Sequence, residues 1–207
     1  MYFGDEVLDL SGRQVTAARV VSRLTSAPLI NLYVAIIMIL WSPIGLGPVL
    51  DPYAAFAICL FWMVILPVVP IVNSALLGKT DLDVSTKENR AKFFAFSLLC
   101  YAFAFLAYLN ASCLIMSSLA AAYFTVTTSI MVATFRTKVS VHGAGVGGPG
   151  TALLYVFGVV ALPVVLVWIA VIWARPILKQ HSTSQTVAGV VIGMIVTALT
   201  YFLIFPA

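Results

Sequence analysis

Charged residues are scarce in this chain of 207 residues. Lys and Arg number 11 and Asp and Glu 7, so that charged residues make up 9% of the sequence, against roughly 25% in soluble domains. Hydrophobic residues make up 62%, and the mean hydropathy is +1.10. Because so few charges cannot cover the surface of a water-soluble globule of this size, the composition predicts an integral membrane protein.

Cysteine and histidine are also scarce, which excludes several classes of site. The three cysteines, Cys59, Cys100 and Cys113, all lie in apolar runs, and their odd number gives no disulfide framework. Two histidines and few acidic residues do not indicate a metal cage, so we expect no metal and no cofactor. The basic residues stand in short clusters between apolar runs, so the net charge of +4 does not indicate a nucleic-acid partner.

Long apolar segments predict the membrane helices. Uncharged segments run over 27–50, 52–77, 93–135, 143–174 and 182–207. A span needs about 20 residues, so 93–135 predicts two helices with a turn near Asn110, Ala111 and Ser112. Segment 143–174 is too long for one span, and Gly158 and Pro163 predict a tight turn between short helices at 146–158 and 162–174. We therefore expect an all-α, polytopic transmembrane helical bundle in which residues 27–207 form a single transmembrane domain of about six or seven membrane helices, including one short hairpin.

The distribution of positive charge supports the hairpin. With seven spans, residues 1–26, 78–92, 136–142 and 175–181 share one side of the membrane, and they contain all 11 Lys and Arg residues. A single span at 143–174 would move Arg175 and Lys179 to the other side. Because cytoplasmic loops are enriched in Lys and Arg, we expect a multi-pass protein of the cell membrane whose basic loops are cytoplasmic and whose C-terminus is outside.

Residues 1–26 predict an amphipathic N-terminal segment. Acidic residues precede any positive charge and no apolar run with a cleavage site follows, unlike a secretory signal. Ser11 and Gln14 fit a capping box at the start of a helix. Around that helix Val15, Val20, Val21 and Leu24 alternate with Arg13, Arg19 and Arg23. Two interpretations fit this pattern, a helix on the membrane surface and an extension of the first span.

Both histidines fall on the basic side, each just before a predicted helix. His142 follows Lys138 and Ser140, and His181 follows Arg175 and Lys179. Cations and hydroxyls donate to phosphate oxygens, and an imidazole can transfer a proton or a phosphoryl group, so each place suits a phosphate. The glycines at 143, 145, 147 and 148 have two interpretations, close approach of backbone amides to a ligand and close helix packing.

The backbone around His181 favours anion binding. Pro176 disfavours helix at Arg175, so we expect the preceding helix to end there, with the guanidinium at the membrane edge. Ser182 and Gln185 fit a capping box at the start of the last helix. His181 then stands beside free amides and the positive end of the helix dipole, which bind anions and favour the neutral imidazole.

These residues resemble the motifs of the type-2 phosphatidic acid phosphatase superfamily of membrane lipid phosphatases. Its third motif is Ser-Arg followed after five residues by His and after three more by Asp, and Arg175 and His181 match this spacing. Ser140 and His142, in Lys-Val-Ser-Val-His-Gly, are similar to the second motif, Pro-Ser-Gly-His. The resemblance extends over residues 78–205.

The first motif and two single positions depart from the family pattern. Asp81, Asp83, Lys87 and Arg90 resemble an acidic and basic loop of some prokaryotic members, without the Arg-Pro pair of the first motif. Ala174 stands where the family has Ser beside the arginine. Gln185 replaces the Asp that orients the nucleophilic histidine.

The resemblance implies metal-independent hydrolysis of an isoprenoid or glycerolipid phosphate, as a monoester or a diphosphate. His181 would attack phosphorus to form a phosphohistidine, and His142 would protonate the leaving alkoxide. Arg175 would stabilise the charge that builds on the phosphoryl oxygens. The expected phosphate-binding residues are Lys138, Ser140, Arg90 and Lys87. Gln185 or Asp83 would orient His181.

A noncatalytic protein that binds or transports a lipid phosphate on the same fold is the alternative. The neutral amide of Gln185 favours it, because an amide cannot stabilise an imidazolium as a carboxylate does. In both cases the expected partners are a lipid phosphate and the lipids of the membrane.

Overall fold

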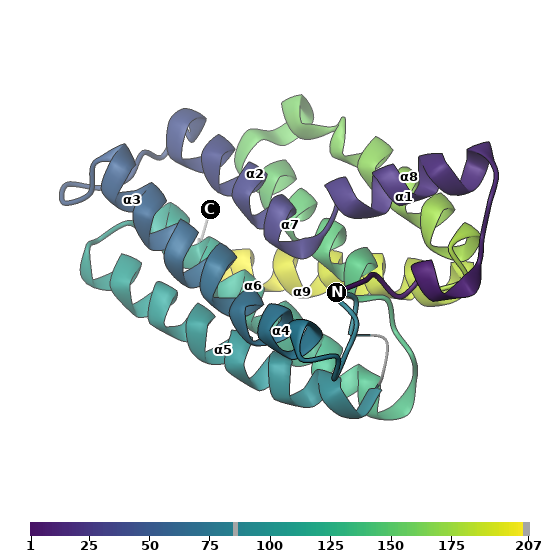
Figure 1. Cartoon of the computed structure of the whole chain (residues 1–207). Coiled ribbons are helices and arrows are strands. Elements are labelled where there is room, and N and C mark those ends of the chain that lie inside the picture. The colour runs from purple at the N-terminus through teal and green to yellow at the C-terminus, as the bar shows by residue number, and fades with distance from the viewer. Residues whose placement is uncertain (85–86, 205–207) are drawn as a thin grey trace.

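The computed structural model describes residues 1–84 and 87–204, and every regular element in these ranges is a helix. The helices are α1 (Arg13–Leu24), α2 (Ala27–Trp41), α3 (Pro52–Cys59), α4 (Leu66–Leu76), α5 (Lys87–Asn110), α6 (Leu114–Arg136), α7 (Val141–Phe157), α8 (Val164–Ile177) and α9 (Thr183–Ile204). A π-helical stretch, Leu60–Ile65, joins α3 to α4, and short 3-10 turns cover Glu6–Leu8 and Gly158–Ala161. The helices pack into one bundle (Figure 1), which confirms the predicted all-α class.

Several helices are long and apolar enough to cross a membrane. Among the described residues these are Pro52–Leu76, Arg90–Asn110, Leu114–Arg136, Val141–Ala161 and Thr183–Ile204. A sixth span results if α1 and α2, which are bent by 55°, are counted as one. Large hydrophobic side chains such as Phe103, Val132 and Leu199 are exposed, as lipid-facing residues are. The chain is a multi-pass membrane protein with up to six such spans and the shorter apolar helix α8.

The predicted breaks between helices lie close to where the structure has them. α5 ends at Asn110, and Ser112 turns the chain with a φ of 55°. The hairpin is present as well, because α7 ends at Phe157 and α8 begins at Val164 after a turn in which Gly158 has a φ of 58°. Segment 27–50 is less helical than its composition suggests, because α2 ends at Trp41 and a loop rich in Gly and Pro follows.

The N-terminal segment contains the expected helix, with two differences. Gly12 rather than Ser11 precedes α1, and no side chain caps it, so the predicted capping box with Gln14 is wrong. The side chains that α1 buries are Ala18 and Ser22, while Val20 and Leu24 are more than half exposed. Small residues allow α1 to lie directly against α8, where Ala18 packs on Ala174 and Leu178.

Two glycine pairs bring α7 and α9 into backbone contact. A Cβ on Gly143 would lie 2.5 Å from the carbonyl oxygen of Thr186, and one on Gly147 would lie 2.4 Å from that of Val190. A Cβ on Gly189 would lie 2.4 Å from the carbonyl oxygen of Ser140, and one on Gly193 would lie 2.7 Å from the amide nitrogen of Gly148. Each pair has the four-residue spacing of membrane helices that approach closely. For Gly143 and Gly147 the helix-packing interpretation is therefore correct.

Candidate active site

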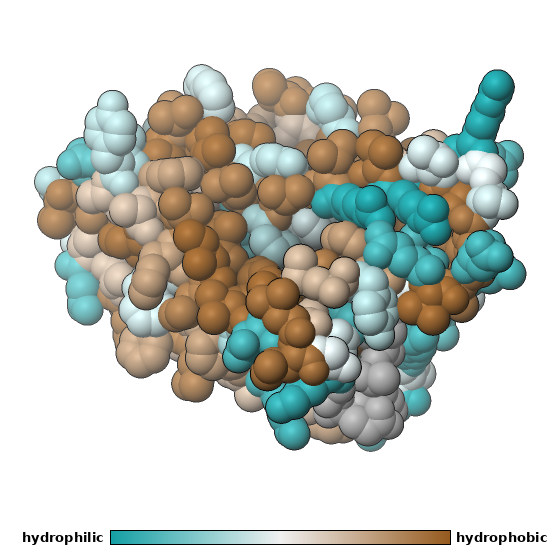
Figure 2. Space-filling view, viewed as in Figure 1, coloured by the Kyte–Doolittle hydropathy of each residue, from teal (hydrophilic) through white to brown (hydrophobic). Residues whose placement is uncertain are grey.

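Polar residues collect at the end of the bundle where α5, α7 and α9 begin and α8 ends. Figure 2 shows hydrophilic residues over α1 and the N-terminal segment at this end, whereas hydrophobic residues cover α3 and α4. The hairpin returns the chain to the end from which α7 starts, so His142 and His181 are close enough for their charges to interact. Arg175, Arg90 and Asp83 lie around them.

Arg175 is the most deeply buried cation of the site, with 2% of its surface exposed. Its Nη1 donates a 2.7 Å hydrogen bond to the hydroxyl of Ser22 and lies 3.9 Å from Oδ1 of Asp83. Its Nε is buried without a hydrogen-bond partner in the part of the chain that the structure describes. Arg175 is therefore enclosed by protein and presents a buried positive charge with a spare donor.

The predicted end of the helix at Arg175 is wrong, because α8 does not end before Pro176. The helix continues to Ile177, and the amides of Leu178 and Gln180 bond to the carbonyls of Ala174 and Arg175. A proline so close to the end of a helix removes a single amide donor, and the rest of the last turn still forms. Lys179 then reverses the chain with a φ of 54° and leads to His181.

His142 opens α7 between two acceptors. Its Nε2 lies 3.9 Å from Oδ1 of Asp83, and the backbone of Ser22 also bonds to the ring. The hydroxyl of Ser140 accepts from the amide of Gly143 and caps the helix. Ser140 is fully buried in this role, so its placement supports the position of His142 rather than the predicted phosphate contact.

His181 precedes α9 and has different neighbours. The predicted capping box is confirmed, because Ser182 N donates to Gln185 Oε1 (3.0 Å) and Gln185 N donates to Ser182 Oγ (3.2 Å). Burial lowers the pKa of His181 to about 3, and the positive charges of Arg175, Arg90 and Lys138 act in the same direction. A hydrogen bond with the side chain of Gln185 raises the pKa, but only in part. The imidazole is therefore neutral near pH 7. Its Nδ1 is buried and has no partner among the described residues.

Asp83 is the carboxylate beside His142, with 3.9 Å between its Oδ1 and the ring Nε2. No ion pair with His181 occurs in the described part of the chain, so its predicted orienting role at His181 has no support in the geometry. Burial raises the pKa of Asp83, although the Arg175 charge and a hydrogen bond from the Gly4 amide lower it. Asp83 therefore takes up a proton more readily than an exposed carboxylate.

The other predicted phosphate ligands differ in accessibility. Arg90 is buried, its Nε donates to the carbonyl of Val84 (2.8 Å), and its Nη1 has no partner among the described residues. Lys138 is exposed, and its charge reaches His181. The backbone of Lys87 begins α5, but its side chain lies outside the part that the structure describes.

Sequence reasoning did not find the N-terminal contribution to the site. Ser22 holds Arg175, Gly4 bonds to Asp83, and the carbonyl of Tyr2 accepts from the amide of Leu82. The one available signal was the spacing of Ala18 and Ser22, which places two small residues on one face of α1 and so predicts close packing there.

An apolar cavity adjoins the charged cluster. Its volume is about 420 Å³, and it lies between α2, α4, α5, α6 and α7. Asp83, Arg90 and His142 line it, whereas Arg175 and His181 do not. His142 and Arg90 thus belong both to the charged cluster and to the lining of the apolar cavity. A ligand with an anionic head and a hydrocarbon tail fits a charged cluster that adjoins an apolar cavity.

No group of three or more His, Cys, Asp or Glu side chains in the described residues is placed to hold a metal ion. No family model, no curated protein and no solved structure matches this chain.

Proposed function

We propose that the protein is an integral membrane phosphatase that hydrolyses a lipid phosphate through a phosphohistidine, in line with the resemblance of Arg175, His142 and His181 to the type-2 phosphatidic acid phosphatase motifs. One observation carries the proposal. A neutral imidazole with an unpartnered nitrogen lies beside buried guanidinium groups, next to a second histidine that lines an apolar cavity.

In the first step His181 attacks phosphorus, a P–N bond forms, and the P–O bond to the lipid breaks. His142 donates a proton to the leaving alkoxide, which departs as the lipid alcohol. In the second step water attacks the phosphohistidine, passes a proton to His142 and releases phosphate. The sum is one lipid phosphate and one water converted to one alcohol and one phosphate.

The charges around the site favour this reaction. Arg175 and Arg90 each carry a buried donor without a partner among the described residues. Such preorganised donors stabilise the charge that accumulates on the phosphoryl oxygens. Asp83 opposes phosphate binding while it is ionised, and its raised pKa makes protonation easier when a phosphate enters.

A noncatalytic lipid-phosphate-binding or transport protein is the second candidate. The observation that favours it is the capping box, which uses the amide of Gln185 at the position where the family has a carboxylate. This protein would bind the same headgroup and release no phosphate.

Phosphate release by the purified protein from isoprenoid and glycerolipid phosphates separates the two candidates. The phosphatase should release phosphate from at least one of them, with His181→Ala as the inactive control. Binding of a lipid phosphate without release, in wild type and control alike, would establish the noncatalytic alternative.

We further propose that the site faces the cytoplasm of a cell-membrane protein, because all basic residues lie on the site's side in the seven-span topology. Single cysteines at the exposed positions 138 and 184, near His142 and His181, in a background without Cys59, Cys100 and Cys113, should react with an impermeant reagent only after the membrane is opened. A cysteine at 110 should react in intact cells. The opposite labelling would reverse the orientation.

A further inference from the structure

The apolar cavity has a charged end and an inner end. Along α5 its lining runs from Arg90 to Tyr101, and along α7 from His142 to Pro149. α6 runs antiparallel to α5, and its lining runs from Ile130, on the charged side, back to Tyr123. The cavity therefore extends from the phosphate end into the membrane-spanning part of the bundle.

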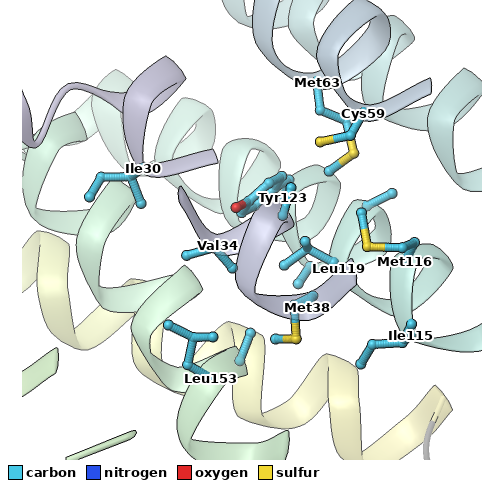
Figure 3. Close-up of a cluster of buried hydrophobic side chains, with 14 of the residues drawn as sticks. Ile30, Val34, Met38, Cys59, Met63, Ile115, Met116, Leu119, Tyr123 and Leu153 are labelled. Atoms are coloured by element: carbon cyan, nitrogen blue, oxygen red, sulfur yellow. The ribbon is translucent and has the colours of Figure 1, made fainter. Parts of the chain in front are cut away.

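Polar groups form the inner end. The side chain of Asn31 donates a 2.8 Å hydrogen bond to the carbonyl of Met63, within the π-helical stretch, and interacts with the hydroxyl of Tyr101. The rings of Tyr101 and Tyr123 lie 5.7 Å apart. The hydroxyl of Tyr123 is buried and has no partner among the described residues. Behind these residues the packed core around Val34, Met38 and Leu119 closes the space (Figure 3).

We propose that this cavity holds a single hydrocarbon chain of limited length and that Asn31, Tyr101 and Tyr123 mark its end. The proposal rests on the proposed function in that it places the phosphate beside His142. It narrows the substrate class to lipid phosphates that insert one chain, and it assigns length selectivity to Tyr123.

The length of the cavity limits the length of the hydrocarbon chain that it can hold. From His142 to Pro149, and from Arg90 to Tyr101, the helices advance about 10 and 16 Å at 1.5 Å per residue. An extended chain with C–C bonds of about 1.5 Å advances about 1.25 Å per carbon, so the cavity accepts about 8 to 13 carbons. The volume of about 420 Å³ is enough for one such chain.

Tyr123 sets the end because its hydroxyl needs a partner. The hydroxyl is buried and has no partner among the described residues. A chain shorter than the cavity does not reach it, whereas a longer chain packs hydrocarbon against this unpaired polar group, which is unfavourable. Tyr123→Phe removes the hydroxyl and keeps the ring, so it removes this penalty for long chains only.

Binding of n-alkyl phosphonates, from four to sixteen carbons, tests the proposal without requiring catalysis. Titration calorimetry on the full chain in amphipathic polymer would compare the wild type, Tyr123→Phe and the control Tyr155→Phe, whose tyrosine does not line the cavity. We expect affinity to rise about fourfold per carbon, equivalent to 0.8 kcal/mol per buried methylene, up to a break. The break should fall between about 8 and 13 carbons.

At and beyond the break, Tyr123→Phe should bind at least threefold more tightly than the wild type, and Tyr155→Phe should match the wild type. A rise through sixteen carbons without a break, or equal tightening by Tyr123→Phe at every length, would overturn the inference. Absence of binding at any length would overturn both the inference and the phosphate site. A break that depends on Tyr123, in a protein that releases no phosphate, would keep the inference and reject the phosphatase.

Discussion

The two histidines of the site begin neighbouring, backbone-packed helices, yet their surroundings differ. His142 faces two acceptors, the carboxylate of Asp83 and the backbone of Ser22, and borders the apolar cavity. His181 faces cations and has a buried nitrogen without a partner in the described part of the chain. A ring held by acceptors suits a proton donor, whereas a neutral ring with a free nitrogen suits a nucleophile.

This difference suggests that the division of labour depends on what surrounds each ring. The carboxylate of Asp83 lies beside His142. Beside His181 stands the neutral amide of Gln185, whose side chain forms a hydrogen bond with the ring. Mutations that remove one set of contacts at a time test this contrast.

Removal of either histidine should have unequal consequences. His181→Ala should lower turnover by roughly 10⁴-fold or more, because it removes the group that forms the covalent intermediate. His142→Ala should cost about 10² to 10⁴-fold, as loss of a general acid does. With an aryl phosphate, whose leaving group needs no proton, only the His142 variant should trap radioactive phosphate on the protein. Trapping in the His181 variant instead would reverse the roles.

Arg175→Met should lower stability by about 3 kcal/mol, because Asp83 would lose its buried partner. Thermal unfolding in detergent measures this. The matched control, Arg136→Met, changes an exposed arginine and should have little effect. Adding Asp83→Asn to Arg175→Met should restore most of the loss, and a failure to do so would show that Arg175 does not stabilise the fold through Asp83.

Acid should destabilise the fold through His181. Its pKa is near 3 in the folded chain and about 6.5 in an unfolded one. Between these values the unfolded state binds the additional proton, so stability falls by at most about 1.4 kcal/mol per unit as pH drops from 6.5 towards 3. His181→Asn should remove this part of the slope. Asp83 acts in the opposite direction at low pH, so the comparison is between wild type and variant at each pH.

Ser22→Ala should cost about 1 to 3 kcal/mol of stability, since it leaves the Arg175 donor without its 2.7 Å bond. It should also raise KM for the lipid phosphate, because the guanidinium loses its fixed position. Ser11→Ala is the matched control in the same segment, because Ser11 caps nothing. Equal effects of the two changes on stability and on KM would contradict a role of α1 in the site.

Gln185→Ala should cost about 1 kcal/mol through loss of the capping box. Gln185→Glu keeps the box and adds a carboxylate beside His181, so stability should be unchanged and turnover should rise. A fall in turnover with Glu, measured at saturating substrate, would mean that the neutral amide is required.

The hydrophobicity pattern and the turn residues of the sequence were sufficient to predict most of the fold. Apolar runs, the turn at Asn110–Ser112 and the Gly158–Pro163 hairpin are local signals, and the distribution of basic residues independently favoured the hairpin. The capping box at Ser182 could be predicted because it is also a local signal. The predicted end of α8 was wrong. A proline disfavours helix at the residue before it, but this preference is weak in a last turn that other backbone hydrogen bonds complete.

The parts of the site that escaped prediction depend on long-range packing. The bond between Arg175 and Ser22 joins residues at opposite ends of the chain, and nothing near Ser22 marks it as a ligand. The cavity is lined by five helices drawn from most of the chain, so its length and its polar end follow only from how the helices pack.

The glycine contacts between α7 and α9 have a consequence for how this chain tolerates mutation. Most lipid-facing positions accept any apolar side chain, because no neighbour limits their size. At Gly143, Gly147, Gly189 and Gly193 even one methyl group meets backbone atoms, so substitution would push the two helices apart. His142 and His181 lie at the starts of these helices and would separate with them. Substitutions at these four glycines should therefore be tolerated as rarely as substitutions of the histidines themselves.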